Sequence, residues 1–513
     1  MRAAGSTWYE TRTPRFSVIT NGQPEQARQL AQDLERFHAV MLKTTTFEAR
    51  EAAPPLRVFL TRDHAEYVAL GGREDSAGMF KSSIRGNFAL VTLKRHYCRE
   101  LTGSHIRCRN ETVSSDAARA VLFHEYVHYV ESQAGSRTPS WYAEGLAEYM
   151  GATQFREDGT YTLGCPREER MGWMRQQDWI PMDKLMTADV IIDIPGHYAN
   201  TYGQAWAAMH YFSADKARAA KLANYLSLWA SGTEHDQAVE QALGVTPEEL
   251  NGVIHEYALQ SHFQCLAAPS AGLDDVPAPS LEELGTAEAH FGIAELLFST
   301  LGPTDAVFDL LAEGHRLAPK EPRLLAALAR AHWARAVRTE RAGDASSASA
   351  PAPTEEDTKK AMAYLTRALR APAGPGAAAY VAVVEGNILT SRAMSQLAGG
   401  DSEAKQTLLR ARKAYRRAIK TDEALAEAYV GLGNTYLVAD NGSNEPIVVL
   451  EAAAYLLPLS AEVPIALAQL RMLRGQYAEA VAPLRYAVAW GAHSGAYEKA
   501  KQLLEQALTA GRE

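Results

Sequence analysis

Small residues recur at a fixed distance in the C-terminal half of the chain. Ala294 and Ala329 are 35 positions apart, and so are Gly433 and Ala468, within a stretch whose apolar pattern is almost wholly helical. Paired helices that cross closely need small residues at the crossing, so this spacing predicts stacked helix pairs in place of one globular core. We therefore expect an all-α solenoid of about five repeats over residues 281–510.

The spacing is similar to that of tetratricopeptide repeats, which are two-helix units of about 34 residues. This resemblance implies a region that binds a protein partner. An unrelated helical bundle is the alternative interpretation, because single units of this kind are degenerate in sequence.

The length of the chain, 513 residues, requires more than one domain, since hydrophobic cores stop growing near about 250 to 300 residues. The segment LAAPSAGLDDVPAPS, residues 266–280, has no apolar period and is rich in Pro, Ala, Ser and Asp, so it is interpreted as a linker. It separates a predicted domain at 8–265 from the repeats at 281–510. A chain ending near Pro277 is expected to fold alone.

The first domain begins with a small α/β unit. FSVIT and LRVFL are typical of short strands, and PEQARQLAQDLERFHAVML is typical of an amphipathic helix. The later strand NFALVT would suit the edge of a cleft, where a peptide substrate pairs with it, or equally the interior of a sheet. Helical segments, among them TYGQAWAAMHYFS and QAVEQALG, follow to about residue 263.

Charge and hydropathy limit the partners. The net charge of −9 and the absence of a basic stripe argue against nucleic acid. No apolar run approaches the roughly 18 residues that a membrane span needs.

The first 16 residues contain no apolar segment of the kind found in secretion signals, so the sequence as it stands predicts a cytoplasmic protein. Cys98 and Cys108 flank one polar loop and could form a disulfide if an N-terminal signal preceded this sequence, in which case the protein would be periplasmic or secreted. None of the four cysteines, which include Cys165 and Cys265, belongs to a CxxC pair, so structural thiols or a disulfide are favoured over metal ligation.

The stretch FHEYVHYV contains the residues that carry chemistry. On a helix, His124 and His128 lie on one face one turn apart and can bind the same metal ion, while Glu125 is rotated by about 100° and can reach a water molecule beside it. A catalytic zinc needs a third protein ligand. The next predicted helix, TPSWYAEGLAEYMG, offers Glu144 and Glu148, again four positions apart.

HEYVH followed by WYAEGLAEY resembles the gluzincin metallopeptidases, and among them the bacterial peptidase MA-like proteins of the domain of unknown function 1570 type. The resemblance covers roughly residues 8–263 and is strongest over 121–150. It implies an α+β zincin-like catalytic domain, with the small α/β part followed by helices, and one Zn²⁺ per chain.

By this resemblance His124, His128 and Glu144 bind the metal and Glu125 is the general base. Glu148 corresponds to an acidic residue that orients a histidine ligand without touching the metal. The short distance along the chain between His128 and Glu144 leaves the opposite assignment of the two later glutamates open.

Gluzincins commonly use a Tyr or His from a downstream helix to stabilise the developing oxyanion. HYANTYGQAWAAMHYF offers His197, Tyr198, Tyr202 and His210, and the YGQAW context favours Tyr202. The alternative is that Tyr202 only packs between helices.

The predicted function is that of a zinc-dependent peptidase whose repeats bind a substrate or partner protein. A catalytically weak or inactive zincin-fold scaffold is the main alternative. A zinc hydrolase acting on another bond is a third possibility, because a zinc ion and a carboxylate also serve the hydrolysis of esters or the deacylation of amides.

Overall fold

The structure is a computed structural model. It describes residues 7–45, 47, 55–74, 76–92, 94–101, 105–112, 115–133, 138–176, 178–188, 191, 194, 198–273, 278–341, 355–457, 460–490 and 496–511. The strands are β1 (Trp8–Arg12), β2 (Phe16–Thr20), β3 (Leu56–Thr61), β4 (Gly78–Ser83), β5 (Gly86–Thr92), β6 (Lys94–Leu101), β7 (His105–Thr112), β8 (Gln154–Phe155), β9 (Thr160–Leu163), β10 (Leu266–Pro269) and β11 (Glu282–Leu284).

The helices of the first half are α1 (Pro24–Thr44), α2 (His64–Ala69), α3 (Ser115–Gln133), α4 (Ser140–Gly151), α5 (Glu168–Gln176), α6 (Met182–Thr187), α7 (Tyr198–Ser213), α8 (Lys216–Ala230), α9 (His235–Leu243) and α10 (Pro247–Ala258). Those of the second half are α11 (Thr286–Leu301), α12 (Asp305–Leu317), α13 (Pro322–Arg341), α14 (Glu355–Arg370), α15 (Pro375–Ala398), α16 (Ala404–Thr421), α17 (Ala426–Val438), α18 (Glu445–Leu456), α19 (Glu462–Leu473), α20 (Tyr477–Trp490) and α21 (Tyr497–Ala510). None of the helices in these described ranges is long and apolar enough to cross a membrane.

A six-stranded sheet organises the first half, in the order β11-β1-β2-β3-β5-β4. Its central strands β2, β3 and β5 are parallel, and every residue of β2 is buried. This is the pattern of strands covered on both faces. FSVIT, LRVFL and the predicted first helix form β2, β3 and α1 as the sequence indicated.

The strand predicted from NFALVT is interior. Its residues belong to β5, which pairs with β3 on one side and with β4 on the other. Of its two interpretations, the cleft-edge strand is therefore wrong. A strand's place in a sheet depends on its neighbours, and the edge here is β4, whose sequence pattern was too weak to predict a strand.

The segment predicted as a linker is partly ordered as strand. Within 266–280, Leu266–Pro269 forms β10, which pairs antiparallel with β9, and just beyond it β11 pairs with β1. Composition predicts irregular structure for this stretch, but the unpaired backbone edges of β9 and β1 supply hydrogen-bond partners that composition cannot reveal.

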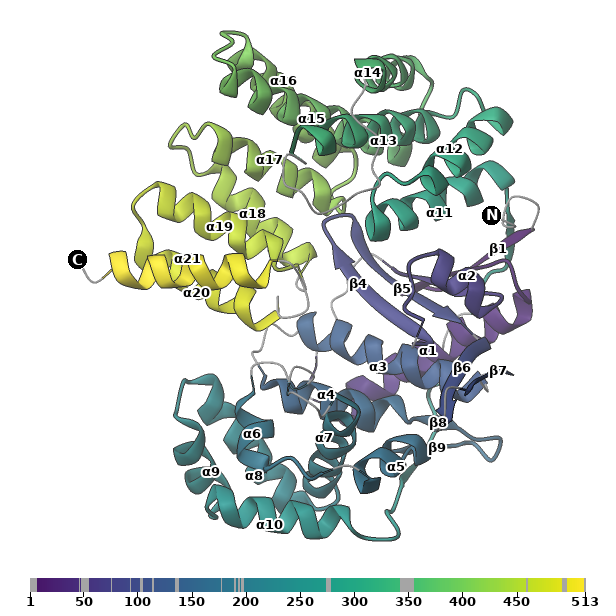
Figure 1. Cartoon of the computed structure of the whole chain (residues 1–513), viewed down its shortest axis with the longest axis vertical. Coiled ribbons are helices and arrows are strands. Elements are labelled where there is room, and N and C mark those ends of the chain that lie inside the picture. The colour runs from purple at the N-terminus through teal and green to yellow at the C-terminus, as the bar shows by residue number, and fades with distance from the viewer. Residues whose placement is uncertain are drawn as a thin grey trace.

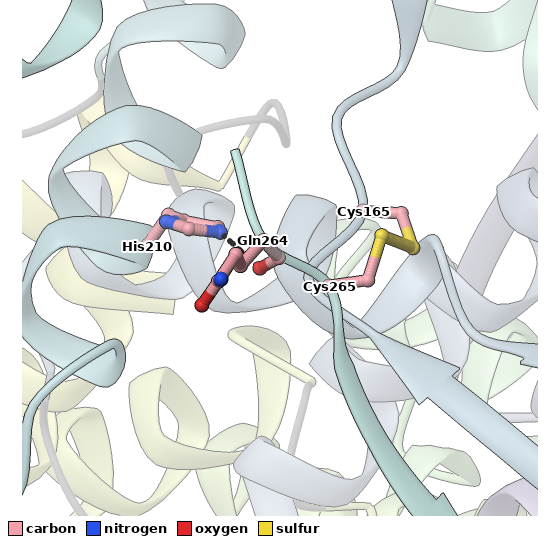
Figure 2. Close-up of a disulfide and its surroundings, with 4 residues drawn as sticks. All are labelled: Cys165, His210, Gln264 and Cys265. Carbon is pink, nitrogen blue, oxygen red and sulfur yellow. Dashed lines mark hydrogen bonds between the residues drawn. A yellow bond between two sulfur atoms is a disulfide. The ribbon is translucent and has the colours of Figure 1, made fainter. Parts of the chain in front are cut away.

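A disulfide joins Cys165 to Cys265, which are separated by 100 residues in the sequence. It lies at the ends of the paired strands β9 and β10, beside the hydrogen bond between His210 and the carbonyl oxygen of Gln264 (Figure 2). Cys98 and Cys108 are directly opposite each other in the β6–β7 ladder, although their side chains lie outside the described part of the structure.

Removing this disulfide should destabilise the protein. A cross-link between residues so far apart restricts the unfolded chain, so replacing Cys165 and Cys265 together by alanine is expected to cost about 2 to 4 kcal/mol. The change in thermal midpoint measures the effect, and the wild-type protein under reducing conditions is the control. An unchanged midpoint would contradict the prediction.

The second half is a series of helix pairs. Helices α11 to α20 form five consecutive pairs, α21 packs on α20, and the first helices of successive pairs contact one another. Figure 1 shows the series arching from α11 beside the sheet to α21 on the other side of the molecule. The recurring small residues lie on α11, α13, α17 and α19, and a Cβ added to Gly433 would lie 2.5 Å from Leu450 of α18.

The repeats share a core with the sheet. The face of the sheet that carries Ile19, Phe59 and Phe88 packs against apolar residues of α11, α12 and α13, such as Leu297 and Leu310. The turn between β4 and β5 adds a contact farther along, where Arg85 pairs with Glu427 of α17 at 3.5 Å. The two halves are therefore one packed body.

This shared core changes the expectation for a chain truncated after Pro277. Truncation would remove β11 and expose the apolar sheet face, so the product should be poorly soluble or bind apolar dyes strongly. Soluble yield and dye fluorescence measure this, with a chain lacking only α21 as the control. A soluble, dye-negative product would show that the sheet does not need the repeats.

Candidate metal centre

Helix α3 brings two imidazoles together. The helix is anchored by its apolar residues, since Phe123 stacks on Phe37 of α1 with ring centroids 4.0 Å apart and Tyr126 packs against Phe16 of β2. His124 and His128 are one turn apart, and their Nε2 atoms are 3.3 Å from each other. The spacing in the sequence thus places two ring nitrogens at one point.

Helix α4 adds a carboxylate at the same point. The Oε2 atom of Glu144 lies 3.2 Å from Nε2 of His124 and 3.5 Å from Nε2 of His128. The two helices pack closely because Gly151 of α4 lies against α3 without a side chain. A Cβ added to Gly151 would lie 3.0 Å from the carbonyl oxygen of Ala120.

These three atoms fit a tetrahedral metal ion. Ligands that bind zinc at about 2.0 to 2.1 Å in a tetrahedron are about 3.3 to 3.4 Å from one another, close to the three distances found here. Oε2 of Glu144 is buried, and although the two imidazole nitrogens lie 3.2 and 3.5 Å away, neither makes a hydrogen bond of good geometry to it. A buried carboxylate oxygen without a donor is costly, and a cation would satisfy it. His124, His128 and Glu144 are the one such potential ligand group among the described residues.

Glu148 lies on the outer side of His124. Its Oε1 atom is 3.4 Å from Nδ1 of His124, the ring nitrogen that faces away from Glu144. Arg170 holds the same carboxylate with bonds of 2.9 and 3.3 Å, and Arg167 adds one of 3.4 Å. Glu148 is therefore placed to orient His124, and it does not reach the convergence point of the two Nε2 atoms.

The charged groups at the centre shift one another's pKa values. Burial by itself would lower the pKa of His128, but Glu144 and the nearby carboxylates raise it well above its usual value. Burial would raise the pKa of Glu144, yet the two imidazoles lower it well below the usual range. The pKa of Glu148 is lowered in the same way, against burial, by Arg170, His124 and Arg167. Glu144 and the two imidazoles thus favour each other's charged forms, so a metal ion would have to displace the imidazole protons in order to bind.

Three residues of this site were not predicted from the sequence. Glu131 lies 3.9 Å from Nδ1 of His128 and accepts a hydrogen bond from Thr138. Its position three residues after the second histidine was a usable signal, because residues i and i+3 share a helix face. Arg167 and Arg170 follow the strand β9 and had no local signal.

Glu125 is partly exposed on α3, next in sequence to His124. The helical step of about 100° turns it away from the two histidines, and it is not one of the three converging groups.

Tyr202 approaches the centre from α7. Its ring centroid is 6.0 Å from that of His124, and the guanidinium of Arg170 lies 4.5 Å from its ring. Helix α7 comes this close to α4 because position 145 is glycine, where an added Cβ would lie 2.6 Å from the carbonyl oxygen of Ala205. The glycine of the EGLA motif therefore has a packing reason.

Of the other three oxyanion candidates, the structure describes the side chain of His210. His210 hydrogen-bonds the carbonyl oxygen of Gln264 at 3.0 Å (Figure 2). It also hydrogen-bonds Tyr257 at 2.7 Å, and burial lowers its pKa. Because a carbonyl can only accept, Nε2 of His210 carries the proton, and the ring is already committed to structural bonds. His197 and the side chain of Tyr198 lie outside the described residues.

Comparisons with known proteins add little. No protein family matches this chain, and no curated protein matches it. Among solved structures, the chain is similar to a thermophilic TPR protein of Thermus thermophilus, with 18% identity over 44% of this chain and 100% of that chain, at a TM-score of 0.31. So low a TM-score carries no argument about either half.

Proposed function

We propose that this protein is a zinc-dependent peptidase of the gluzincin type with a zincin-like catalytic fold. The convergence of His124 Nε2, His128 Nε2 and Glu144 Oε2 at distances that suit a tetrahedral ion carries the proposal. The site also has the further parts that hydrolysis needs, which are a nearby carboxylate and a phenol approaching from another helix.

Each residue has a separate task in the proposal. Bound zinc would lower the pKa of a water molecule and polarise the scissile carbonyl. Glu125 would accept the proton of that water on a carboxylate oxygen and pass it to the nitrogen of the leaving amine. Glu148 and Glu131 would keep the two imidazoles in the orientation that presents Nε2.

Tyr202 would donate its hydroxyl hydrogen bond to the carbonyl oxygen as negative charge develops there. Replacing Tyr202 by phenylalanine should therefore lower turnover by about a hundredfold and leave zinc content and substrate affinity almost unchanged. Steady-state kinetics on one peptide substrate, with Tyr211→Phe on the same helix as the control, measures the effect. Equal turnover of both variants would assign Tyr202 to packing.

The helix pairs are proposed to be tetratricopeptide-like repeats that bind protein. Their 35-residue spacing and buried small residues support this. Since the first pairs cover the sheet, a partner or substrate would contact the later pairs or the junction with the first half.

The disulfide supports an oxidising compartment, such as a periplasm or the cell exterior, over the cytoplasm predicted from the sequence as it stands. Cytosolic thiols are kept reduced, so disulfides form and persist mainly in oxidising compartments.

Metal analysis combined with a cleavage profile tests the proposed function. The purified chain should contain one zinc per molecule and cleave members of a broad peptide library. Chelation should abolish cleavage and added zinc should restore it. One zinc per chain without any cleavage would favour the inactive scaffold, and cleavage of esters alone would favour a hydrolase of another bond.

A further inference from the structure

Arg170 of α5 links two parts of the candidate metal centre. Its Nη2 and Nε atoms donate to Oε1 and Oε2 of Glu148 at 2.9 and 3.3 Å, which is the two-point contact that a planar guanidinium makes with a carboxylate. The Oε1 atom that accepts the shorter bond is also the one that lies 3.4 Å from Nδ1 of His124. Arg170 therefore fixes the oxygen that faces the ring of His124.

The same guanidinium lies against the ring of Tyr202. Its central carbon is 4.5 Å from the ring centroid, which is within the range of a cation–π contact. The centroid of this ring is in turn 6.0 Å from that of His124. A cation at the face of a phenol attracts the π electrons and makes the hydroxyl a stronger hydrogen-bond donor. One side chain thus contacts the group that orients a metal ligand and the group proposed to stabilise the oxyanion.

The glycine at position 203 allows this placement. Helix α5 packs on α7, and a Cβ added to Gly203 would lie 3.0 Å from the carbonyl oxygen of Arg170 and 3.1 Å from Cβ of Met174. Met174 is itself buried in the core, so α5 cannot retreat freely. A larger residue at position 203 would push α5 from α7 and move the guanidinium of Arg170 off the neighbouring ring.

A second arginine makes Arg170 replaceable without leaving a bare charge. Arg167 bonds the same carboxylate of Glu148 at 3.4 Å, and the side chain of Glu148 is only 1% exposed. A buried carboxylate without any cation is strongly destabilising. A protein that lacks Arg170 keeps Arg167 as a partner for Glu148 and should therefore still fold.

We propose that Arg170 is a positioning residue of the metal centre, which holds Glu148 toward His124 and keeps Tyr202 in place as a strong hydrogen-bond donor to the substrate carbonyl. The role toward Glu148 needs only a bound metal ion, whereas the role toward Tyr202 rests on the proposed peptidase function. Removing the guanidinium should weaken zinc binding through one partner and slow turnover through the other.

Zinc affinity, measured by chelator competition, tests the contact with Glu148. Arg170→Met removes the charge and is expected to weaken zinc binding by about tenfold, the lower end of the effect of losing an outer partner of a metal ligand, because Arg167 remains. In the Glu148→Ala background the same change should have no further effect, because the carboxylate is gone. Arg175→Met, on the same helix and bonded to the carbonyl oxygen of Gln260, is the control that should retain the wild-type affinity. An equal loss in both backgrounds, or no loss relative to the control, would overturn the proposal.

Turnover at saturating zinc tests the contact with Tyr202. Arg170→Met is expected to lower kcat by about threefold to thirtyfold, the range that a cation–π contact supplies, and to leave KM almost unchanged. In the Tyr202→Phe background it should have little effect, since no hydroxyl is left to strengthen. Arg170→Lys keeps a positive charge but loses the planar fork, so it should recover part of kcat without recovering zinc affinity. Equal factors in the two backgrounds would contradict the role toward Tyr202.

Thermal unfolding of each variant shows whether it is folded. If Arg170→Met does not fold, Arg170→Lys decides the role toward Glu148 through its zinc affinity, and an affinity equal to that of the wild type would overturn the proposal. A wild-type protein that binds zinc but cleaves no peptide would contradict the proposed function alone, and the zinc measurements would then decide the role of Arg170. A wild-type protein that binds no zinc would overturn both.

Discussion

Glu144→Ala is expected to abolish zinc binding, whereas Glu148→Ala should weaken it by only about 10 to 100-fold. The first change removes one of three converging ligand atoms and leaves two imidazoles. The second removes a group that lies 3.4 Å from the outer nitrogen of His124 and leaves all three converging atoms in place.

Competition with a chromogenic chelator at fixed pH measures both affinities. Glu148→Ala also leaves the partly buried Arg167 and Arg170 without their anion, which is destabilising, so Glu148→Gln should accompany it as the variant that retains hydrogen-bond acceptance. Glu157→Ala, at an exposed position after α4, is the control. If Glu148→Ala proved the more damaging change in a folded protein, the two glutamates would exchange roles.

Glu125→Gln is expected to retain stoichiometric zinc and to lower the rate of peptide hydrolysis by about 10²- to 10⁴-fold. The amide is nearly the same size as the carboxylate but cannot accept a proton from water, so only the general-base step is lost, and that step alone contributes about 10²- to 10⁴-fold. Because Glu125 is not one of the converging groups, the metal should remain.

Zinc content and initial rates on the same samples test this prediction, with His128→Ala as the contrasting variant. His128→Ala should lose zinc and activity together, while Glu125→Gln separates them. Full activity of Glu125→Gln would exclude the proposed mechanism, and loss of zinc in that variant would make Glu125 a ligand.

The sequence by itself determined the local arrangements. His124 and His128 converge because a helix repeats every 3.6 residues, and this holds wherever the helix lies. Glu144 and Glu148 were identified as a pair for the same reason, and the 35-residue spacing of Ala294 and Ala329 predicted the helix pairs. The strands β2 and β3 were also evident, since short segments that alternate and are rich in Val, Ile and Phe are typical of strands.

Tertiary structure decided the features that depend on contacts between elements far apart in the sequence. The two glutamates lie on one face of α4, so only the approach of α4 to α3 could place Glu144 at the convergence point and leave Glu148 with Arg167 and Arg170. Strand β5 became interior because β4 added to its free edge.

The disulfide and the position of Arg170 also depend on contacts between elements that are far apart in the sequence. Cys165 found Cys265 across 100 residues because β9 pairs with β10, and Arg170 lies over the ring of Tyr202 because α5 packs on α7. Periodicity along one helix or strand can be read from neighbouring residues, but these contacts are set by the packing of whole elements, which no short stretch of sequence encodes.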